Sequence, residues 1–447
     1  MKTIASMHSE NQYPRVLLVL MTKVMADDPG NLLIRAQFGN WPEDRIAQIH
    51  ASGDPAGSGE FCGSYYRLQE CDRLFGAVFQ RLRSGVFEMV SMDRVQDNSK
   101  VQPAGPLQRS VKMLRKRVGD WLIGTGLWEV IFHVRLSEPM AAFVEGFKPD
   151  LIYCQGYSFG FATLPLPIAR RFGIPICFQT TDDWPSYTYR GFPMGWLLRL
   201  RARQLVVAAK VRLAFGEKMR KVYEQRYGVP FIATYHLDDP RRFPTVASVD
   251  IEPCRVVYTG SLGLRRYEAV QDLLAVVRTM NGHQKAIQIH IYSSGIPRDT
   301  PRELLESPEI EFLPLPTHDE LPSILASASV LFLPESFCVP PEMIELAISS
   351  KVHLYMMSGR PILVYGPAYS GTVGYALEGG WAAVVTERNR DALKTALRKL
   401  LDDNHGNDEL MRNARARVGS HHDSVSGRAR FLSALADAFP KWHATGG

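Results

Sequence analysis

The stretch of sequence that decides the fold is Val256-Val-Tyr-Thr-Gly-Ser-Leu-Gly-Leu-Arg-Arg-Tyr-Glu-Ala-Val270. Its apolar run ends in Thr259-Gly260-Ser261, a glycine-containing turn follows, and Tyr267 begins a helical pattern. Glycine lets a backbone approach a ligand closely, and the first N–H groups of a helix lack partners within the helix. The same order of apolar run, turn and amphipathic run recurs along the chain. We therefore predict an α/β protein whose parallel sheets are covered by helices on both faces.

The expected strands fall into two series, which indicates two domains. The first series covers residues 15–21, 150–154, 174–179, 212–216 and 231–235, and the second covers 255–260, 286–292, 310–313, 330–333, 361–365 and 382–386. Between them, residues 237–250 are rich in Asp, Pro and Ser, which is typical of a linker. We predict a domain over residues 1–245, a second over 246–425, and a C-terminal helix over 426–447 that can pack back on the first. Residues 409–438 have a helical pattern with a break near 419–426.

The composition is that of a folded globular protein. The chain has 447 residues, of which 45% are hydrophobic and 22% charged, which excludes a disordered or fibrous chain. The net charge of +6 suits anionic small molecules or an anionic membrane surface and does not call for nucleic acid. The six cysteines are scattered without a CxxC pair, which predicts no structural zinc site and favours a reducing, cytoplasmic compartment. The apolar stretch at residues 16–21 is too short to span a bilayer.

A second informative segment is Ser349-Ser-Lys-Val-His-Leu-Tyr-Met-Met-Ser-Gly-Arg-Pro-Ile-Leu-Val-Tyr-Gly366. It predicts a helix that begins at a serine cap, ends at Gly359 and leads into a strand. Lys351 falls in the first turn, where a cation does not complement the helix dipole, so a bound anion would explain it. Arg265 and Arg266 in the first segment can likewise pair with a phosphate. The alternative for all three is an ordinary solvated side chain.

Taken together and in this order, the two segments resemble the C-terminal half of GT-B-type glycosyltransferases of family 4, which include bacterial surface-polysaccharide enzymes. That family typically has a Tyr-Thr-Gly-Ser turn with a following Arg and a Ser-Lys-x-x-Glu-Tyr-x-x-x-Gly-Arg-Pro segment. Residues 320–334 are similar to the helix and strand just before that segment. Residues 147–153, 174–175 and 215–219 are similar to the N-terminal half, and the likeness weakens between residues 50 and 140. The resemblance implies two doubly wound, Rossmann-like domains that face each other across a cleft.

The resemblance also implies an activity. A hexose would move from a UDP- or GDP-type nucleotide sugar to a glycan or lipid-linked acceptor, with retention of configuration and without a metal or other cofactor. Arg266 and Lys351 would hold the diphosphate and stabilise the charge that develops on it, and are thus the expected catalytic residues. The other residues expected at the donor are Gly260, Ser261, Arg265, Tyr292, Ser293, Leu315, Glu345 and Leu354.

One position departs from the family pattern. The family commonly has a Glu that accepts hydrogen bonds from the donor ribose, and Leu354 occupies that position here. Either the ribose is held differently, for example by Glu345, or the donor pocket is altered. Two alternatives to a transferase therefore stay open: a catalytically degenerate subunit that binds nucleotide sugars, and another GT-B enzyme such as a nucleotide-sugar epimerase.

Three strand ends of the first domain are candidates for acceptor binding. Gly30 and Asn31 follow the first strand, Gln155 follows the second, and Asp182 and Asp183 follow the third. Adjacent carboxylates can orient sugar hydroxyls, although a turn or cap role explains each of these residues equally well.

The stretch Arg109-Ser-Val-Lys-Met-Leu-Arg-Lys-Arg-Val-Gly-Asp-Trp-Leu122 is a possible membrane contact. On a helical wheel it combines an apolar face bearing Trp121 with a cationic face, which is typical of docking on anionic lipid. This would associate the chain peripherally with the inner face of the membrane. The alternative is a core-packed helix with a solvated basic side.

Overall fold

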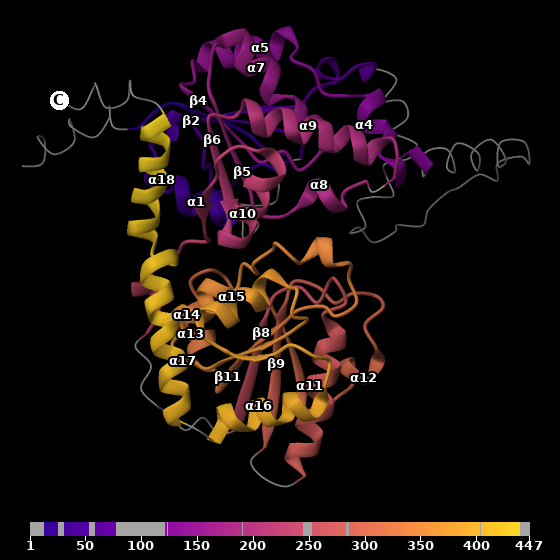
Figure 1. Cartoon of the computed structure of the whole chain (residues 1–447), viewed down its shortest axis with the longest axis vertical. Coiled ribbons are helices and arrows are strands. Elements are labelled where there is room, and N and C mark those ends of the chain that lie inside the picture. Colours follow the sequence, from indigo (N-terminus) through magenta and orange to yellow (C-terminus); the bar gives the residue numbers. More distant parts are fainter. Residues whose placement is uncertain are drawn as a thin grey trace, which may run out of the picture.

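The computed structural model describes residues 13–25, 31–52, 59–76, 121–122, 124–189, 191–244, 253–282, 286–402 and 404–438. Within them, two α/β domains are stacked along the long axis of the molecule (Figure 1). Each domain has a sheet whose strands are all parallel, with helices on both faces. This arrangement agrees with the fold class that the repeating strand and helix pattern predicts.

The first domain contains a seven-stranded sheet in the order β3-β2-β1-β4-β5-β6-β7. Its strands are β1 Val16–Val19, β2 Ile46–His50, β3 Ser64–Arg67, β4 Leu151–Cys154, β5 Ile176–Thr180, β6 Val211–Phe215 and β7 Ile232–Thr234. Its helices are α1 Leu32–Phe38, α4 Leu127–Ile131, α5 Glu138–Phe147, α6 Phe159–Thr163, α7 Pro165–Phe172, α8 Trp184–Tyr187, α9 Met194–Ala208 and α10 Gly216–Tyr227, with short 3-10 turns η2 Glu43–Arg45, η3 Glu70–Asp72 and η5 Pro240–Arg242.

The second domain contains a six-stranded sheet in the order β10-β9-β8-β11-β12-β13. Its strands are β8 Cys254–Thr259, β9 Ile287–Ser293, β10 Ile310–Pro314, β11 Val330–Pro334, β12 Ile362–Tyr365 and β13 Ala383–Val385. Its helices are α11 Tyr267–Asn281, α12 Arg302–Leu305, α13 Leu321–Ala326, α14 Val352–Met357, α15 Gly371–Gly379, α16 Arg390–Asp402 and α17 Asn404–Arg417, with the 3-10 turn η6 Pro341–Met343.

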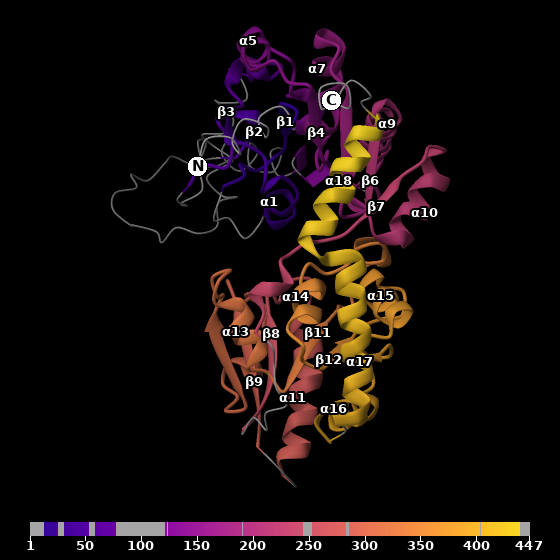
Figure 2. The same ribbon diagram turned by 90° about the vertical axis from the view of Figure 1, so that its left-hand side faces the viewer.

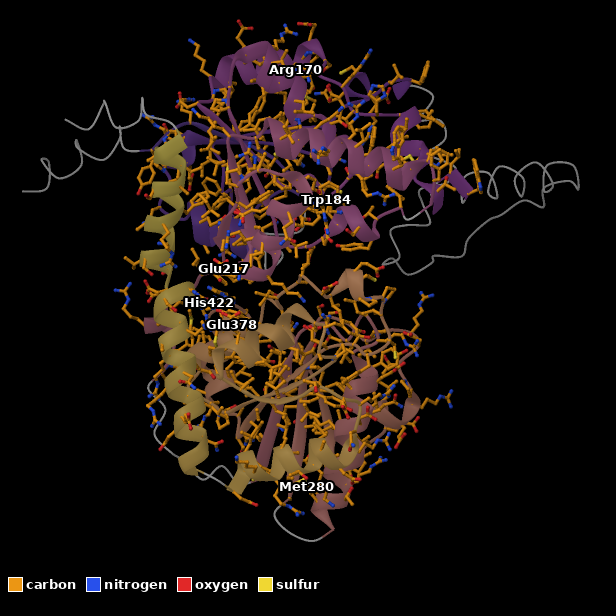
Figure 3. The ribbon with its side chains drawn as sticks, in the orientation of Figure 1. Arg170, Trp184, Glu217, Met280, Glu378 and His422 are labelled. Atoms are coloured by element: carbon orange, nitrogen blue, oxygen red, sulfur yellow. The ribbon has the colours of Figure 1, made fainter. Side chains whose placement is uncertain are left out.

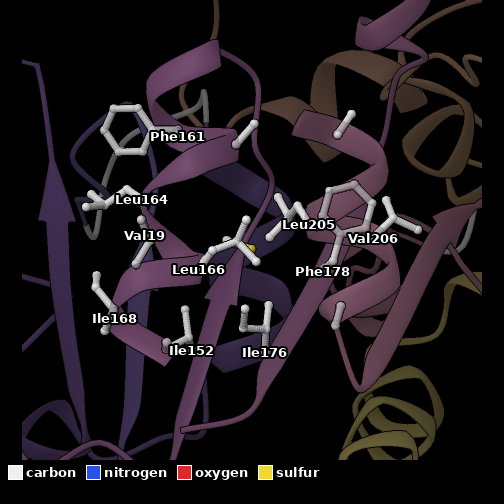
Figure 4. Close-up of a cluster of buried hydrophobic side chains, with 14 of the residues drawn as sticks. Val19, Ile152, Phe161, Leu164, Leu166, Ile168, Ile176, Phe178, Leu205 and Val206 are labelled. Carbon is white, nitrogen blue, oxygen red and sulfur yellow. The ribbon is translucent and has the colours of Figure 1, made fainter. Parts of the chain in front are cut away.

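One apolar cluster of the first domain lies between its sheet and the helices α6, α7 and α9, and a second lies on the other face of the sheet, against α1 and α18. Figure 4 shows Val19, Ile152, Ile176 and Phe178 on the strands, facing apolar side chains of α6, α7 and α9. Such strands are apolar along their whole length because a parallel sheet is covered on both faces.

All eleven predicted strands are present, but two strands were not predicted. β2 is fully buried although it contains Gln48 and His50, and β3 is a half-exposed edge strand. The backbone N–H of Val24 donates to Gln48 Oε1 over 2.9 Å, and Gln48 Nε2 donates to the carbonyl of Thr22 over 2.7 Å. Because these partners satisfy the polar side chain of Gln48, β2 can be a buried interior strand without being wholly apolar.

The C-terminal helices join the two domains on one side of the molecule (Figure 2). α17 packs on the second domain, a π-helical turn follows at η7 Val418–His422, and α18 Ser424–Ala438 packs on α1 and β6 of the first domain. The turn confirms the predicted break in the C-terminal helical pattern. Phe431 of α18 is buried against Phe38 of α1, with ring centroids 5.2 Å apart.

The two segments that connect the domains, around Asp238 and around His422, are hydrogen-bonded to each other. The backbone N–H of Asp238 donates to the carbonyl of His422 over 3.1 Å, and that of Ser424 donates to the carbonyl of Asp238 over 2.9 Å. The ring of His422 also contacts the carbonyl of His236 over 2.7 Å. Figure 3 places His422 and Glu217, the second residue of α10, near this junction. Among the helices in the described ranges, none combines the length and the apolar character needed to cross a bilayer.

Candidate functional site

In the second sheet, the order of successive strands reverses between β8 and β11, its two central strands. α11 and α16 cover one face of the sheet, whereas α13, α14 and α15 cover the other. In such doubly wound sheets, ligands bind beyond the carboxyl ends of the strands at this point of reversal. Four side chains or backbone positions gather there, namely Gly260 after β8, Arg266 before α11, Glu335 after β11 and Lys351 before α14.

Gly260 lies directly beneath the side chain of Lys351. A Cβ atom at residue 260 would overlap Lys351 Cε and lie 2.8 Å from Lys351 Nζ. The φ angle of Gly260 is +123°, a conformation that other residues rarely adopt. The backbone N–H of Gly260 donates to the carbonyl of Tyr292 over 2.7 Å, which fixes the turn against β9. The absence of a side chain at Gly260 therefore makes room for the lysine.

Arg266 is held beside this lysine by a buried carboxylate that sequence analysis missed. Its Nη2 lies 3.1 Å from Oε2 of Glu335, and Thr372 Oγ1 donates to Oε1 of Glu335 over 2.7 Å. A Cβ atom at residue 366 would lie only 2.6 Å from Glu335 Cβ, so Gly366 leaves space for the carboxylate. Both oxygens of Glu335 are engaged, and the carboxylate fixes the orientation of the guanidinium.

The electrostatic environment of Lys351 reflects this arrangement. The pKa of Lys351 is lowered from 10.5 to about 8, because desolvation and the neighbouring Arg266 outweigh the opposite effect of Glu335. The ammonium also lies 5.5 Å from the ring centre of Tyr258. Two cations and one carboxylate leave an excess of positive charge at the carboxyl ends of β8 and β11. A bound anion would reduce the cost of placing Arg266 and Lys351 so close together.

The structure thus brings Arg266 and Lys351 together beside Gly260, as the sequence predicts, while their role in binding stays a prediction. Arg265 is placed differently, because it is exposed and forms an ion pair with Glu268 on α11. Ser261 stabilises the turn itself, since its carbonyl accepts from the hydroxyl of Tyr258 over 2.5 Å.

The remaining predicted donor residues lie at the ends of β9 and β10. Tyr292 is partly buried and packs against the apolar core beneath α13 and α14. Ser293 Oγ donates to the carbonyl of Gly295 over 2.8 Å, and Leu315 is exposed just after β10. None of these contacts tests a role in binding the base or ribose.

Leu354 points into the interior of the second domain. It is buried on α14 among apolar neighbours, so it offers no group to a ligand. Glu345 is half-exposed and its Oε1 lies 3.6 Å from Lys218 Nζ on α10. Glu345 is therefore paired across the boundary between the domains.

The segment that carries Glu345 and Lys351 contacts the first domain at several points. α10 begins at Gly216, where a Cβ atom would lie 2.7 Å from Ile348 Cδ1. Lys218 Nζ also donates to the carbonyl of Tyr369 over 3.3 Å, and α8 packs against η6. A movement of the first domain would thus shift the segment that ends at Lys351, because the two are in contact.

The predicted acceptor residues differ in how many hydrogen bonds and ion pairs they form within the protein. Asp183 is buried, accepts from Arg226 Nη2 over 2.9 Å and from the Tyr223 hydroxyl over 2.9 Å, and so has a structural ion pair. Asp182 is only half-buried and accepts from the Tyr157 hydroxyl over 3.3 Å. Burial raises the pKa of Asp182.

The other predicted positions of the first domain are less informative. Gln155 is half-buried just after the carboxyl end of β4. Asn31 precedes α1, and its Nδ2 donates to the carbonyl of Lys23 over 3.3 Å. Gly30 and residues 109–120 of the predicted membrane contact lie outside the described residues. Trp121, at the end of that stretch, is exposed.

Two further findings bear on the chemistry available. All six cysteines lie within the described ranges and none forms a disulfide. Within the same ranges, no group of three or more His, Cys, Asp or Glu side chains is arranged to hold a metal ion.

Comparison with known proteins finds similarity in the three-dimensional structure of the chain. No family model and no curated sequence matches it. The sucrose-phosphate synthase of Thermosynechococcus elongatus aligns with a TM-score of 0.62 at 12% identity, covering 96% of this chain and 100% of that chain. The chain has a GT-B fold. HepE from Anabaena, solved with UDP and glucose, aligns over 95% of this GT-B chain and 100% of its own, with a TM-score of 0.60 at 13% identity. An α,α-trehalose 6-phosphate synthase from Burkholderia multivorans gives a TM-score of 0.57 at 13% identity, covering 97% and 99%.

Proposed function

We propose that this GT-B protein is a glycosyltransferase that takes a hexose from a nucleoside-diphosphate sugar. The proposal rests on one observation. Arg266 and Lys351 lie close together beside Gly260, where the strand order of the second sheet reverses between β8 and β11. HepE, which shares the fold, was solved with UDP and with UDP-glucose. We infer that the second domain of this chain likewise binds a nucleotide-sugar donor. The motifs of residues 256–270 and 349–366 further favour a family 4 enzyme that retains configuration.

The proposed chemistry follows from charge. Breaking the bond between sugar and phosphate leaves negative charge on the departing diphosphate. Lys351 and Arg266 stabilise that charge, and Glu335 positions the guanidinium so that it need not reorganise during the reaction. A metal ion is not required for this step. The acceptor, a glycan or a lipid-linked sugar, would bind at the first domain near Asp182 and Gln155.

Ligand-induced stabilisation tests donor binding. We expect UDP, GDP or one of their sugars to raise the melting temperature of the full chain, since a ligand that binds only the folded state stabilises it. Lys351→Ala should abolish this shift. Lys399→Ala is a matched control, because Lys399 is an exposed lysine on α16 of the same domain and is not among the predicted donor residues. An unchanged nucleotide affinity in Lys351→Ala would contradict the assigned role.

A second candidate function is a subunit that binds nucleotide sugars without turning them over. The observation that favours it is Leu354, which is buried where the family places a ribose-binding Glu. The two candidates differ in one measurement. A transferase releases nucleoside diphosphate when a glycan or lipid-linked acceptor is added, whereas the binding subunit shows the thermal shift and no release. Conversion of the donor into an isomer without acceptor would instead identify an epimerase.

A further inference from the structure

One face of α9 in the first domain exposes large apolar side chains to solvent. Phe192, just before the helix, is 88% exposed, and Trp196 is 53% exposed. Leu200 and Val207 continue the same face at helical spacing and are also exposed. The opposite face of α9 packs on α6 and the sheet. Contiguous exposed apolar groups of this size mark interaction surfaces in soluble proteins.

The same stretch is strongly cationic. Residues 188–210 contain five Arg or Lys residues and no Asp or Glu. Arg199 lies exposed between Trp196 and Leu200. Arg201 donates to the amide oxygen of Gln204 over 2.7 Å, and Arg203 donates to the carbonyl of Arg226 over 3.3 Å. Both acceptors are neutral, so these two hydrogen bonds do not neutralise the positive charges of Arg201 and Arg203.

We propose that the exposed face of α9, together with Phe192, docks on an anionic lipid bilayer. Aromatic and aliphatic side chains can enter the boundary between headgroups and acyl chains, while arginines beside them bind the acidic headgroups. The charge also decides against a second copy of this chain as the occupant, because self-pairing would bring two cationic faces together. In the sequence, this surface is a different segment from residues 109–122, on which the sequence-based expectation of membrane contact depends.

The position of the α9 face suits a lipid-linked acceptor. α8 follows the carboxyl end of β5 and packs against η6 of the second domain, and α9 is the next helix along the chain. Tyr189, just after α8, packs on Gly126, and its hydroxyl donates to Glu129 Oε1 over 2.7 Å. Docking at Phe192 and Trp196 would therefore bring the edge where the domains meet close to the membrane. Only this last step, the delivery of a lipid-linked acceptor, rests on the proposed transferase function.

Vesicle co-sedimentation of the full chain, without nucleotide, tests the docking. We expect the chain to pellet with vesicles of phosphatidylcholine and phosphatidylglycerol in a three-to-one ratio and to stay in solution with phosphatidylcholine alone. The double variant Phe192→Ser, Trp196→Ser should bind roughly tenfold more weakly, and Arg199→Glu at least about fivefold more weakly. Leu377→Ser and Arg398→Glu, at exposed positions on α15 and α16 of the second domain, should bind like the parent chain.

Three outcomes would overturn the docking proposal. They are equal binding to both kinds of vesicle, equal binding by the α9 variants and their controls, and self-association of the parent chain that the α9 variants lose without any vesicle binding. Because the substituted side chains are exposed, all variants should keep the parent melting temperature and the parent thermal shift with nucleotide. A failure of docking with an intact nucleotide shift would leave the donor-site proposal standing, and the reverse result would leave docking standing.

Discussion

Donor binding should be coupled to the protonation of Lys351, and the coupling can be measured. The pKa of Lys351 in the free chain is about 8, because desolvation and Arg266 together outweigh the effect of Glu335. A bound diphosphate adds negative charge beside the ammonium and raises this pKa. Binding is then accompanied by proton uptake, and the affinity falls wherever the free lysine has lost its proton.

The magnitude follows from the titration of a single group. With a free pKa of about 8, nearly all of Lys351 is charged at pH 7 and roughly one tenth of it at pH 9. The affinity for the nucleotide sugar should therefore fall roughly tenfold between pH 7 and pH 9. Near pH 8, about half a proton should be taken up for each ligand bound.

Isothermal titration calorimetry in two buffers of different ionisation enthalpy measures both quantities. Lys351→Arg should bind with an affinity that is independent of pH in this range, because a guanidinium does not titrate there. Glu335→Gln removes the carboxylate that favours the charged lysine, so the fall in affinity should move to lower pH. Lys399→Ala should follow the parent curve. Equal parental affinity at pH 7 and pH 9, with no proton uptake, would refute the reasoning.

Three further predictions concern the free chain. Lys351→Met should raise the free energy of unfolding at pH 7 by up to about 3 kcal/mol, since it removes an ammonium whose pKa folding lowers from 10.5 to about 8; chemical denaturation that shows no gain would argue against this cost. Gly260→Ala should cost about 1–3 kcal/mol of backbone strain and also weaken donor binding. Gly173→Ala, where φ is +69° and no atom lies within 4 Å of the added Cβ, should show only a loss of stability, so equal donor affinities in the two variants would contradict the prediction. Acid should destabilise the fold, because burial lowers the pKa of His236 to about 4 and that of His422 to about 3, both below the usual 6.5. The unfolded chain then binds more protons, so stability is complete above pH 6.5 and falls as the pH drops, by about 1 kcal/mol for each ring at pH 5.5; denaturation curves that coincide at pH 7.5 and pH 5.5 would speak against it.

The sequence was most informative where residues that are neighbours in the chain also determine the local structure. The apolar strands of both sheets were predicted because a parallel sheet covered on both faces demands continuous apolar runs. Lys351 and Arg266 were found because each lies at the start of a helix next to a recognisable turn. In both cases the signal is carried by residues that are neighbours in the chain.

Glu335 could not be found in this way. It is a single carboxylate after Pro334, outside any motif, and its importance comes from the pairing of β11 with β8, which brings it to Arg266. A charged residue directly after a wholly apolar strand was the available signal. Similarly, Asp182 and Asp183 are equivalent in sequence, and only the position of α10 shows that Arg226 engages Asp183 and not its neighbour.

The place of α18 has a consequence for the order in which the chain folds during synthesis. Its Phe431 and Leu435 complete an apolar cluster with Val16 and Phe38, which leave the ribosome some four hundred residues earlier. Until the last helix emerges, that patch of the first domain stays uncovered, and exposed apolar surface of this kind makes a nascent chain prone to aggregation. A chain that stops short at the C-terminal end would keep the patch exposed permanently, even though the two sheets are already encoded in full.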